Sequence, residues 1–419
     1  MQSREQQSVL VIGAGIIGVC SALELQKRGF QVTLVEADRP AAGASEGNCG
    51  LLAVGSVVPF SKPGTFKKVP GWLLNKNGPL SIRWNYFPKL IPWFLEFLKA
   101  SRASRIQEIS QGLAALTEHA FDAYEPWLEE AGIKDLLKPH ETLIVYETEQ
   151  EYRDDVANLQ IEKDLGFDYE ELSKSRLREL EPSLSDQFAC GVRLKGWYYF
   201  ADPKRLVTSL YDLFVRKGGT VVTGTVTSIN VENGRATSVN FCGQPPESFD
   251  NVVVAAGVWS RKLADKLGDK LPVEALAGYS TTVSDPGIEV KHAITYAAGG
   301  FVITPMESGL RIGGTIEMGG VDSKPDFGRA KVIAEKAKRV FNGLKNVSGT
   351  EWMGYRSFMP DTLPVIDRAS SASNVFYAFG HGQIGITTGA ITGRLVAEMV
   401  GREQTSIGLA PYSARRFKD

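Results

Sequence analysis

The stretch Ser8-Val-Leu-Val-Ile-Gly13-Ala-Gly15-Ile-Ile-Gly18 decides the fold of this chain. Its first half is apolar and rich in β-branched residues, which predicts a buried parallel strand. The three glycines spell G-x-G-x-x-G and open a helical stretch that runs to about Arg28. Gly13 permits a tight turn, Gly15 lets the backbone approach a pyrophosphate, and Gly18 lets the helix pack close to the strand.

The residues after this helix complete a strand–helix–strand unit. Gly29 stands where a C-cap glycine belongs, and Gln31 to Val35 predict a second strand that ends in Glu36. A carboxylate at that place can accept both ribose hydroxyls of an adenosine, and the phosphates would meet the positive end of the helix. We therefore expect dinucleotide binding by Gly13, Gly15, Ile16, Ile17, Gly18, Glu36 and Ala37.

The next segment, residues 41–52, is small, polar and glycine-rich, so its backbone can run against a flat ring. Together with the strand–helix–strand unit, it resembles the D-amino-acid-oxidase-like superfamily of FAD enzymes. The bacterial D-amino acid dehydrogenases have a similar stretch that ends in Asn-x-Gly, here Asn48-Cys49-Gly50. The resemblance implies that FAD is the cofactor and that the flavin ring contacts Ser45, Gly47, Asn48, Gly50 and Leu51.

Three later segments extend the resemblance. In such flavoproteins a strand like Asn251 to Gly257 returns to the cofactor sheet, and its small end passes near the pyrophosphate. Val226 stands where the family touches the adenine through a valine backbone. The segment Gly380 to Gly385 resembles the C-terminal flavin motif, whose helix N-terminus stabilises negative charge on reduced flavin. The cofactor residues implied are Val226, Ala255, Ala256, Gly257, Trp259, Gly380, His381, Gly382, Gln383, Ile384 and Gly385.

Arg356 is the candidate substrate-binding residue. A guanidinium forms two parallel hydrogen bonds with a carboxylate, and the family's oxidases carry their carboxylate-binding arginine in a similar Gly-x-Arg context. The alternative is an arginine in a structural ion pair. His381 either contacts flavin or substrate or caps the last helix.

The sequence offers few acid–base residues, and that scarcity fits hydride transfer. No HxxxH pair, paired carboxylate or nucleophile elbow occurs, so we expect neither metal nor acyl-transfer chemistry. Transfer of the α-hydrogen of an amine to flavin as hydride requires no strong base. Some family members tether flavin to a cysteine in the segment occupied here by residues 354–360. This chain has none there, which predicts non-covalent FAD.

The order of elements predicts an α/β fold with two parts. We expect a Rossmann-like FAD-binding domain with a central parallel sheet, built from residues 1–58, 180–275 and 350–419. An inserted α+β substrate domain with an antiparallel sheet would use residues 59–179 and 276–349. We expect an amphipathic helix over 101–130, a helix over 328–344, and turns or strand ends at Gly313 and Gly314.

Residues 59–105 mix nine cations and nine aromatic side chains with a single acid, Glu96. One interpretation is an interfacial membrane segment. The other is a basic loop whose aromatic residues pack under the substrate domain.

Composition limits the remaining classes. The chain has 419 residues, net charge −1 and 43 glycines without a G-X-Y period. Bulk charge gives no support for nucleic-acid binding. The four cysteines form no CxxC pair, and residues 1–7 lack the apolar core of a signal peptide. We expect a cytoplasmic protein, either free or peripherally bound to the inner face of the cytoplasmic membrane.

The leading hypothesis is an FAD-dependent dehydrogenase of small D-amino acids, or of imino acids such as D-proline or hydroxy-D-proline, that passes electrons to a quinone or other carrier. One alternative is an oxygen-using amino acid oxidase of the glycine or sarcosine type. Another is a flavoprotein subunit of a hetero-oligomeric dehydrogenase.

Overall fold

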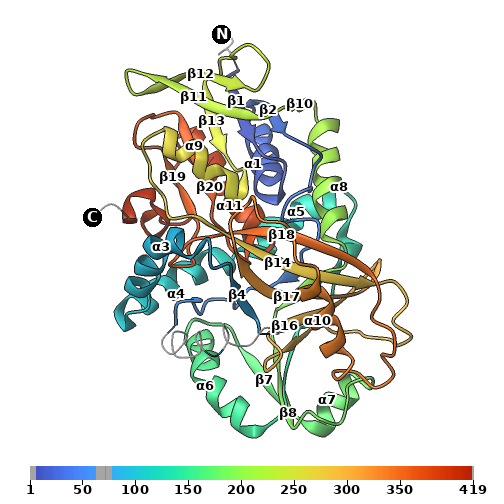
Figure 1. Ribbon diagram of the computed structural model, residues 1–419. Coiled ribbons are helices and arrows are strands. Elements are labelled where there is room, and N and C mark those ends of the chain that lie inside the picture. The colour runs from blue at the N-terminus through green and yellow to red at the C-terminus, as the bar shows by residue number, and fades with distance from the viewer. Residues whose placement is uncertain (1–5, 63–70, 72–77, 418–419) are drawn as a thin grey trace.

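Two large sheets, one above the other, organise the chain in the computed structural model, which describes residues 6–62, 71 and 78–417 (Figure 1). The upper sheet has six strands in the order β10-β2-β1-β13-β20-β19. Its strands are β1 (Ser8–Ile12), β2 (Gln31–Glu36), β10 (Thr220–Thr223), β13 (Asn251–Val254), β19 (Val365–Arg368) and β20 (Val375–Phe379). All neighbouring pairs are parallel except β19 with β20. The expected Rossmann-like sheet is therefore confirmed.

Both faces of this sheet are buried, which explains why β1 is apolar throughout. Val9 and Val11 face one core, whereas Leu10 and Ile12 face another. Helices cover the first face and a hairpin with one helix covers the second. These elements are α1 (Ile16–Lys27), α5 (Ala120–Glu130), α8 (Pro203–Arg216) and α11 (Gly385–Gly401) on the first, with β11 (Val226–Glu232), β12 (Arg235–Phe241) and α9 (Ser260–Lys266) on the second.

The lower sheet is mostly antiparallel and follows the order β18-β14-β17-β16-β15-β6-β8-β7, with β4 paired to β17. Only β15 with β6 and β17 with β4 are parallel among the pairs of its described strands. The strands are β4 (Leu80–Ile82), β6 (Leu143–Tyr146), β7 (Tyr169–Ser173), β8 (Cys190–Leu194), β14 (Glu274–Val283), β15 (Ile294–Tyr296), β16 (Phe301–Met306), β17 (Gly309–Met318) and β18 (Thr350–Phe358).

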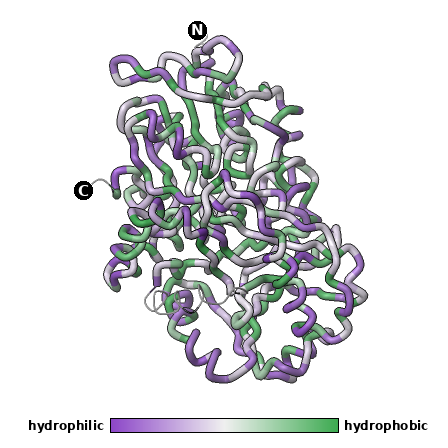
Figure 2. Tube along the Cα trace, in the orientation of Figure 1, coloured by the Kyte–Doolittle hydropathy of each residue, from purple (hydrophilic) through white to green (hydrophobic). Residues whose placement is uncertain are grey.

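Smaller elements join and flank the two sheets. Figure 2 shows hydrophobic stretches running through the interior, with hydrophilic ones at the lower edge near α6. A small three-stranded sheet pairs segments that are far apart in the sequence: β3 (Leu51–Leu52), β9 (Tyr198–Phe200) and β5 (Leu137–Lys138). The remaining helices are α3 (Phe87–Ala100), α4 (Ala103–Thr117), α6 (Glu149–Asp164), α7 (Lys174–Leu180) and α10 (Gly328–Ala337).

Several expected boundaries differ from the structure. The helix expected over 101–130 is two helices, α4 and α5, and the one expected over 328–344 ends at Ala337. Gly313 and Gly314 lie inside β17 and not in a turn. The strands β8 and β18 belong to the lower sheet, although their residues fall in ranges assigned above to the FAD-binding domain. We propose a two-domain division in which β8 and β18 belong to the substrate domain.

The basic aromatic segment is partly described. Residues 63–70 and 72–77, with Phe66, Lys67, Lys68, Trp72 and Lys76, lie outside the described residues. In the part that is described, residues 87–100 form α3. No helix in the described ranges combines the length and apolar character needed to span a bilayer.

Candidate functional site

The glycine turn between β1 and α1 has the geometry of a phosphate-binding turn. Gly13 has a φ of +106°, and a Cβ there would lie 2.7 Å from the Ala255 carbonyl oxygen. A Cβ at Gly18 would overlap the carbonyl oxygen of Gly13. At Gly15 a Cβ would approach nothing closer than Ser45 Oγ, at 3.6 Å. Gly13 and Gly18 are thus needed for packing, whereas Gly15 keeps an open side at the helix N-terminus, where a phosphate can approach.

Hydrogen bonds gather the other predicted residues around this turn. Glu36 accepts hydrogen bonds from Ala14 N–H at 2.7 Å and from Ala37 N–H at 2.8 Å, one on each carboxylate oxygen. The oxygen that accepts from Ala37 also accepts a long hydrogen bond from Asp38 N–H at 3.4 Å, so the oxygen that accepts from Ala14 keeps a lone pair for a ribose hydroxyl. Ile16 N–H donates to Ser45 Oγ at 3.3 Å. Ser45 therefore lies at the glycine turn, next to the N-terminus of α1.

The returning strand β13 ends against the same turn. Ala255 N–H donates to the Ile12 carbonyl at 2.9 Å, and the backbone of Ala256 also contacts Gly13. Gly257, with a φ of +54°, begins a short 3₁₀ turn that ends at Trp259. The Trp259 ring is exposed and meets Tyr355 edge-on.

Val226 comes directly after the short connection that leads from β10 to β11. Gly224 N–H donates to the Glu36 carbonyl at 2.8 Å, which places this connection beside the ribose-binding candidate. Val226 itself begins β11 and packs on the core beneath it.

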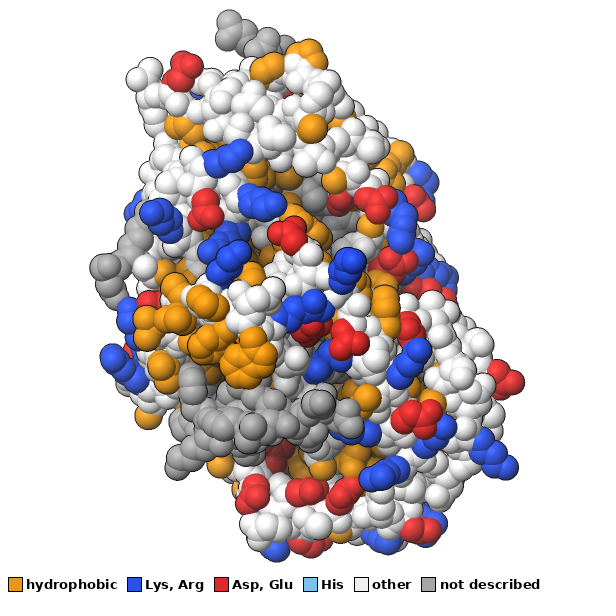
Figure 3. Space-filling view, in the orientation of Figure 1, with side chains coloured by type: hydrophobic (Ala, Val, Ile, Leu, Met, Phe, Trp, Pro, Cys, Tyr) orange, Lys and Arg blue, Asp and Glu red, His pale blue; other side chains and the backbone are white. Residues whose placement is uncertain are grey.

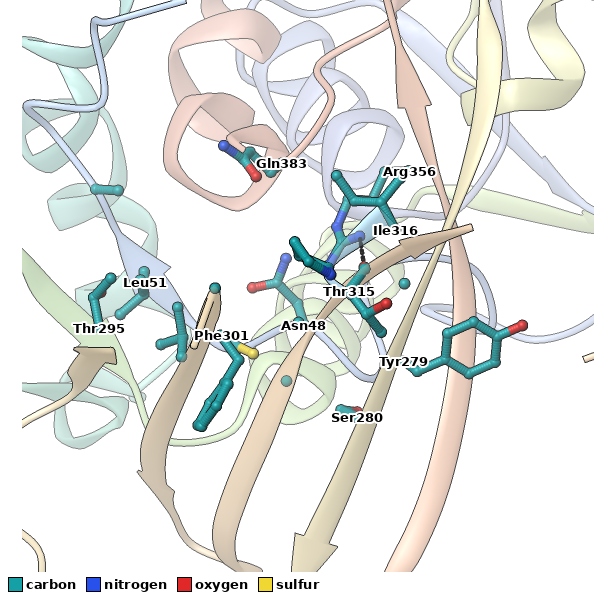
Figure 4. Close-up of a pocket in the computed structure, with 18 of the residues that line it drawn as sticks. Asn48, Leu51, Tyr279, Ser280, Thr295, Phe301, Thr315, Ile316, Arg356 and Gln383 are labelled. Atoms are coloured by element: carbon teal, nitrogen blue, oxygen red, sulfur yellow. Dashed lines mark hydrogen bonds between the residues drawn. The ribbon is translucent and has the colours of Figure 1, made fainter. Parts of the chain in front are cut away.

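A cavity of about 520 Å³ lies where the two sheets meet. Its walls come from the residue 44–60 segment, from β14, β16, β17 and β18, and from the start of α11. The predicted residues that line it are Gly47, Asn48, Leu51, Arg356, Gly382, Gln383 and Ile384. Figure 4 shows Gln383 and Asn48 on the same side of Arg356.

Arg356 is the only charged side chain among the described residues that line this cavity. Its Nη1 donates to the Thr315 carbonyl at 3.1 Å, and within the described chain no carboxylate lies within 4.0 Å of its guanidinium. The structural ion pair is therefore not formed there. Burial lowers the pKa of Arg356, because a desolvated cation is disfavoured. A half-buried cation with unused donors that face a cavity is suited to bind an anionic ligand.

The residue that holds Arg356 is conformationally strained. Thr315 has a φ of +56°, which is a rare conformation for a β-branched residue. It lies at the register shift between β14 and β17, where two residues of β17, Thr315 and Ile316, face the single residue Gly278. Its Oγ1 accepts a hydrogen bond from Arg329 Nε at 3.0 Å. Thr315 thus contacts one arginine through its carbonyl and another through its hydroxyl.

Close packing leaves no room for a side chain at Gly278. A Cβ there would overlap the Arg356 guanidinium, so this glycine lets the arginine lie across β14. Gly47 similarly faces the ring of Trp352, which a Cβ would overlap. Gly313 is covered by Cys49 Sγ, and its neighbour Gly314 by Phe301.

A second half-buried arginine, Arg311, holds the small-residue loop. Arg311 Nη1 donates to the Asn48 carbonyl at 2.8 Å and to the Glu46 carbonyl at 3.3 Å. Asn48 Oδ1 in turn accepts from Gly50 N–H at 2.7 Å. Gly50 has a φ of +74°, and a Cβ there would overlap the Phe200 carbonyl oxygen, so both its conformation and its packing require glycine.

Residues 380–385, the C-terminal motif, lie partly in the cavity wall and partly in the core. Gly382, Gln383 and Ile384 line the cavity, and Gly385 begins α11 just behind them. His381 is buried, does not line the cavity, and makes a 3.0 Å hydrogen bond from Nε2 to Thr392 Oγ1. Burial lowers its pKa to about 3, so the ring is neutral near pH 7. Gly380, with a φ of +83°, packs on Met359.

Sequence reasoning missed Thr315, Gly278, Trp352 and Arg311. The Gly313–Gly314 pair beside Thr315 was the available signal, because adjacent glycines within a strand indicate close packing or a bulge. Among the described residues, no three His, Cys, Asp or Glu side chains are grouped so that they could hold a metal ion.

The residues present suit a dinucleotide that carries a flat ring. Gly15 leaves an open side at the helix N-terminus where a pyrophosphate would fit, Glu36 ends β2 where a ribose would be bound, and the cavity beyond has glycine-rich walls. The family described as FAD dependent oxidoreductase matches residues 8–399.

This chain belongs to that family of FAD-dependent oxidoreductases. It is therefore an enzyme whose cofactor is FAD. It is 32% identical over 420 residues to a D-amino-acid oxidase of Bradyrhizobium diazoefficiens, with 99% of each chain covered. It is 30% identical to a D-amino acid dehydrogenase of Xanthobacter autotrophicus, with 98% of this chain and 99% of the relative covered.

Solved structures of such flavoenzymes share the fold. Glycine oxidase from Geobacillus kaustophilus matches with a TM-score of 0.76 at 22% identity, covering 98% of this chain and 99% of that one. L-Proline dehydrogenase from P. horikoshii matches with a TM-score of 0.75 at 19% identity, covering 99% and 98%.

Proposed function

We propose that this enzyme oxidises small D-amino acids or imino acids, such as D-proline or hydroxy-D-proline, with the substrate carboxylate bound to Arg356. The observation that carries the proposal is the single, half-buried cation in the cavity wall, which has no carboxylate partner among the described residues. The single negative charge of a substrate carboxylate would neutralise the positive charge of Arg356. Two relatives named for D-amino acids, each aligned over nearly the whole chain, support the substrate class.

The cavity also argues for an uncharged substrate side chain. No Asp, Glu, Lys or His occurs among its described lining residues, so a second charge on the substrate would be buried without a partner. A volume of about 520 Å³, shared with the flavin ring, favours a small molecule.

The protein's task in such a reaction is binding and orientation. Arg356 fixes the carboxylate, Thr315 fixes Arg356, and the apolar wall around Leu51, Phe301 and Ile316 excludes water. FAD, when bound, would supply the acceptor for the α-hydrogen and its electron pair. Water would then hydrolyse the imine of a primary amino acid to a keto acid and ammonia. No general base is required if the amine binds uncharged.

Anaerobic reduction of the flavin tests the proposal. Purified holoenzyme is mixed with a panel of D-amino acids, their L-enantiomers, glycine and sarcosine, and the flavin absorbance is followed. We expect bleaching by D-alanine, D-proline or a similar neutral D-substrate, and none by D-aspartate or D-lysine. Bleaching by L-enantiomers alone, or by no member of the panel, would refute the proposal.

For the electron acceptor we propose a quinone or another carrier. The relative named as a dehydrogenase supports this choice. The relative named as an oxidase favours oxygen as a second candidate. Hydrogen peroxide released at the rate of substrate consumption would assign an oxidase. Slow peroxide release with fast dye reduction would assign a dehydrogenase. A partner subunit would be indicated if activity returned only when a second chain was added.

A further inference from the structure

Helix α3 has two apolar faces on opposite sides. The buried face, with Leu90, Trp93 and Phe97, packs against Leu80, Ile82 and Phe358. The other face carries Phe87, Ile91, Leu95 and Leu98, which fall within an arc of roughly 80° at 100° per residue. Trp84 extends this face, since its ring lies 6.1 Å from that of Phe87. We call Trp84, Phe87, Ile91, Leu95 and Leu98 the α3 ridge.

The α3 ridge is unusually exposed for large apolar side chains. Trp84 is 74% exposed, Leu95 55% and Ile91 47%. These five residues are the majority of the large exposed apolar side chains in the described chain. Figure 3 shows a contiguous hydrophobic patch at the position of α3. Contiguous patches of this kind mark interaction surfaces, whereas single exposed residues do not.

The charge around the α3 ridge is positive. Residues 78–105 contain five cations, Arg83, Lys89, Lys99, Arg102 and Arg105, and one acid, Glu96. Lys89 and Arg102 are exposed near the two ends of the helix. Lys99 pairs with Glu96 at 2.8 Å, Arg83 pairs with Glu317, and Arg105 pairs with Glu108. Lys89 and Arg102 therefore carry the positive charge that no carboxylate of the described residues compensates. The surface therefore combines an apolar stripe containing tryptophan with an excess of positive charge.

We propose that the α3 ridge is a docking surface for an anionic lipid bilayer. An amphipathic helix with a basic border lies in the plane of the membrane interface, with its apolar face among the acyl chains. Tryptophan prefers that interface, and anionic headgroups attract each exposed lysine and arginine. The buried face anchors α3 to the protein, and the exposed α3 ridge contacts the lipid.

Charge argues against a second copy of this chain as the occupant. A twofold contact through the α3 ridge would bring together the uncompensated charges of Lys89 and Arg102 from both copies, and like charges at an interface oppose association. A negatively charged bilayer has the opposite, complementary charge.

The α3 ridge lies close to the catalytic cavity. Phe60 and Leu80 line the cavity and belong to the cluster that holds the buried face of α3. A docked α3 would bring the bilayer beside this wall, from which a lipid-soluble electron acceptor could approach. The docking itself does not depend on which acceptor the enzyme uses.

Vesicle flotation with the full-length holoenzyme tests the proposal. Vesicles are made from equal parts of phosphatidylglycerol and phosphatidylcholine, or from phosphatidylcholine alone. We expect flotation with the anionic vesicles, weakened by about 0.5 M NaCl through screening. Ile91→Asn with Leu95→Asn should lower vesicle affinity roughly a hundredfold, since each buried branched side chain contributes about tenfold. Lys89→Glu with Arg102→Glu should remove the preference for anionic vesicles.

A matched variant controls for surface changes elsewhere. Val215→Asn alters an apolar residue on α8 that is 42% exposed, and it should float as the unmodified protein does. All variants should keep flavin bleaching and reduction of a water-soluble dye, so a failure of docking is separable from a failure of the proposed reaction. Absence of flotation, or equal flotation of the Ile91/Leu95 variant, would overturn the proposal. A dimer in light scattering that the same variant abolishes would instead assign the α3 ridge to a second copy.

Discussion

Arg356 donates a hydrogen bond from Nη1 to the backbone carbonyl of Thr315, 3.1 Å away, and Thr315 makes this contact from a left-handed conformation with a φ of +56°. The strain arises at the register shift between β14 and β17, which turns the Thr315 carbonyl toward the cavity. Strained backbone beside a half-buried cation is typical of sites where geometry is held for function.

Loss of the Arg356 side chain should impair substrate use without loss of cofactor. For Arg356→Ala we expect kcat/KM to fall by roughly 10²–10³, since truncating a buried charge-paired group costs about 2–5 kcal/mol. Arg356→Lys should recover part of this loss, because it restores charge but not the two-pronged geometry. Initial rates with a soluble dye measure the effect, and visible flavin absorbance checks that FAD remains bound. Unchanged kcat/KM in the alanine variant would remove Arg356 from the site.

The strain at Thr315 should show in an inverted order of variant stabilities. Thr315→Gly relieves the left-handed conformation, whereas Thr315→Val keeps it, and both lose the hydroxyl that accepts from Arg329. We expect the glycine variant to be more stable than the valine variant by about 1–2 kcal/mol. Thr304, buried in β16 and without a positive φ, is the matched control. There valine should be the more stable. Urea unfolding of the four variants gives the comparison, and the same order at both sites would contradict strain at Thr315.

Substitution of Gly15 should lower FAD affinity, whereas substitution of Gly18 should lower the stability of the apoprotein. Because a Cβ at Gly15 meets nothing closer than 3.6 Å, Gly15→Ala should fold normally but bind FAD roughly 10- to 100-fold more weakly. Because a Cβ at Gly18 overlaps the Gly13 carbonyl, Gly18→Ala should destabilise the apoprotein itself. Thermal melting of the apoproteins and titration with FAD, followed by flavin fluorescence, separate the two effects. A destabilised Gly15→Ala apoprotein would mean that this glycine is structural.

Protonation of His381 should contribute to acid destabilisation. Its pKa is lowered to about 3 in the folded chain, from 6.5, so the unfolded chain binds the proton more readily. Stability from this residue is therefore complete above pH 6.5 and is lost as the pH falls toward 3. Between pH 7 and pH 5 we expect a loss of about 2 kcal/mol that His381→Gln does not show. Urea unfolding at the two pH values measures it, and equal losses would refute this assignment.

The flavin should be released by acid. Cysteine is absent from residues 354–360, and burial raises the pKa of Cys49, the cysteine among the described lining residues, which disfavours its reactive thiolate. After precipitation with trichloroacetic acid we expect a yellow supernatant and a colourless pellet. A yellow pellet would demonstrate a covalent link.

Local sequence predicted the cofactor unit well because its determinants are local. The strand β1 begins and ends as expected, and Gly13, Gly15 and Gly18 lie at the turn where their spacing places them. By contrast, Gly313 and Gly314 resembled turn residues, since the sequence does not show that Cys49 and Phe301 cover them. The break between α4 and α5 also escaped prediction, because the apolar pattern continues across it.

The sequence by itself determined the cofactor class, through the glycine spacing and the carboxylate of Glu36, because a turn, a helix terminus and a strand end are set within a few residues. It also singled out Arg356 by residue type and context. Only the tertiary structure decided how Arg356 is held. Gly278, Thr315 and Arg329 come from three separate elements, and their meeting depends on a register shift between two strands. Strand register is fixed by packing across the whole sheet, and no local pattern encodes it.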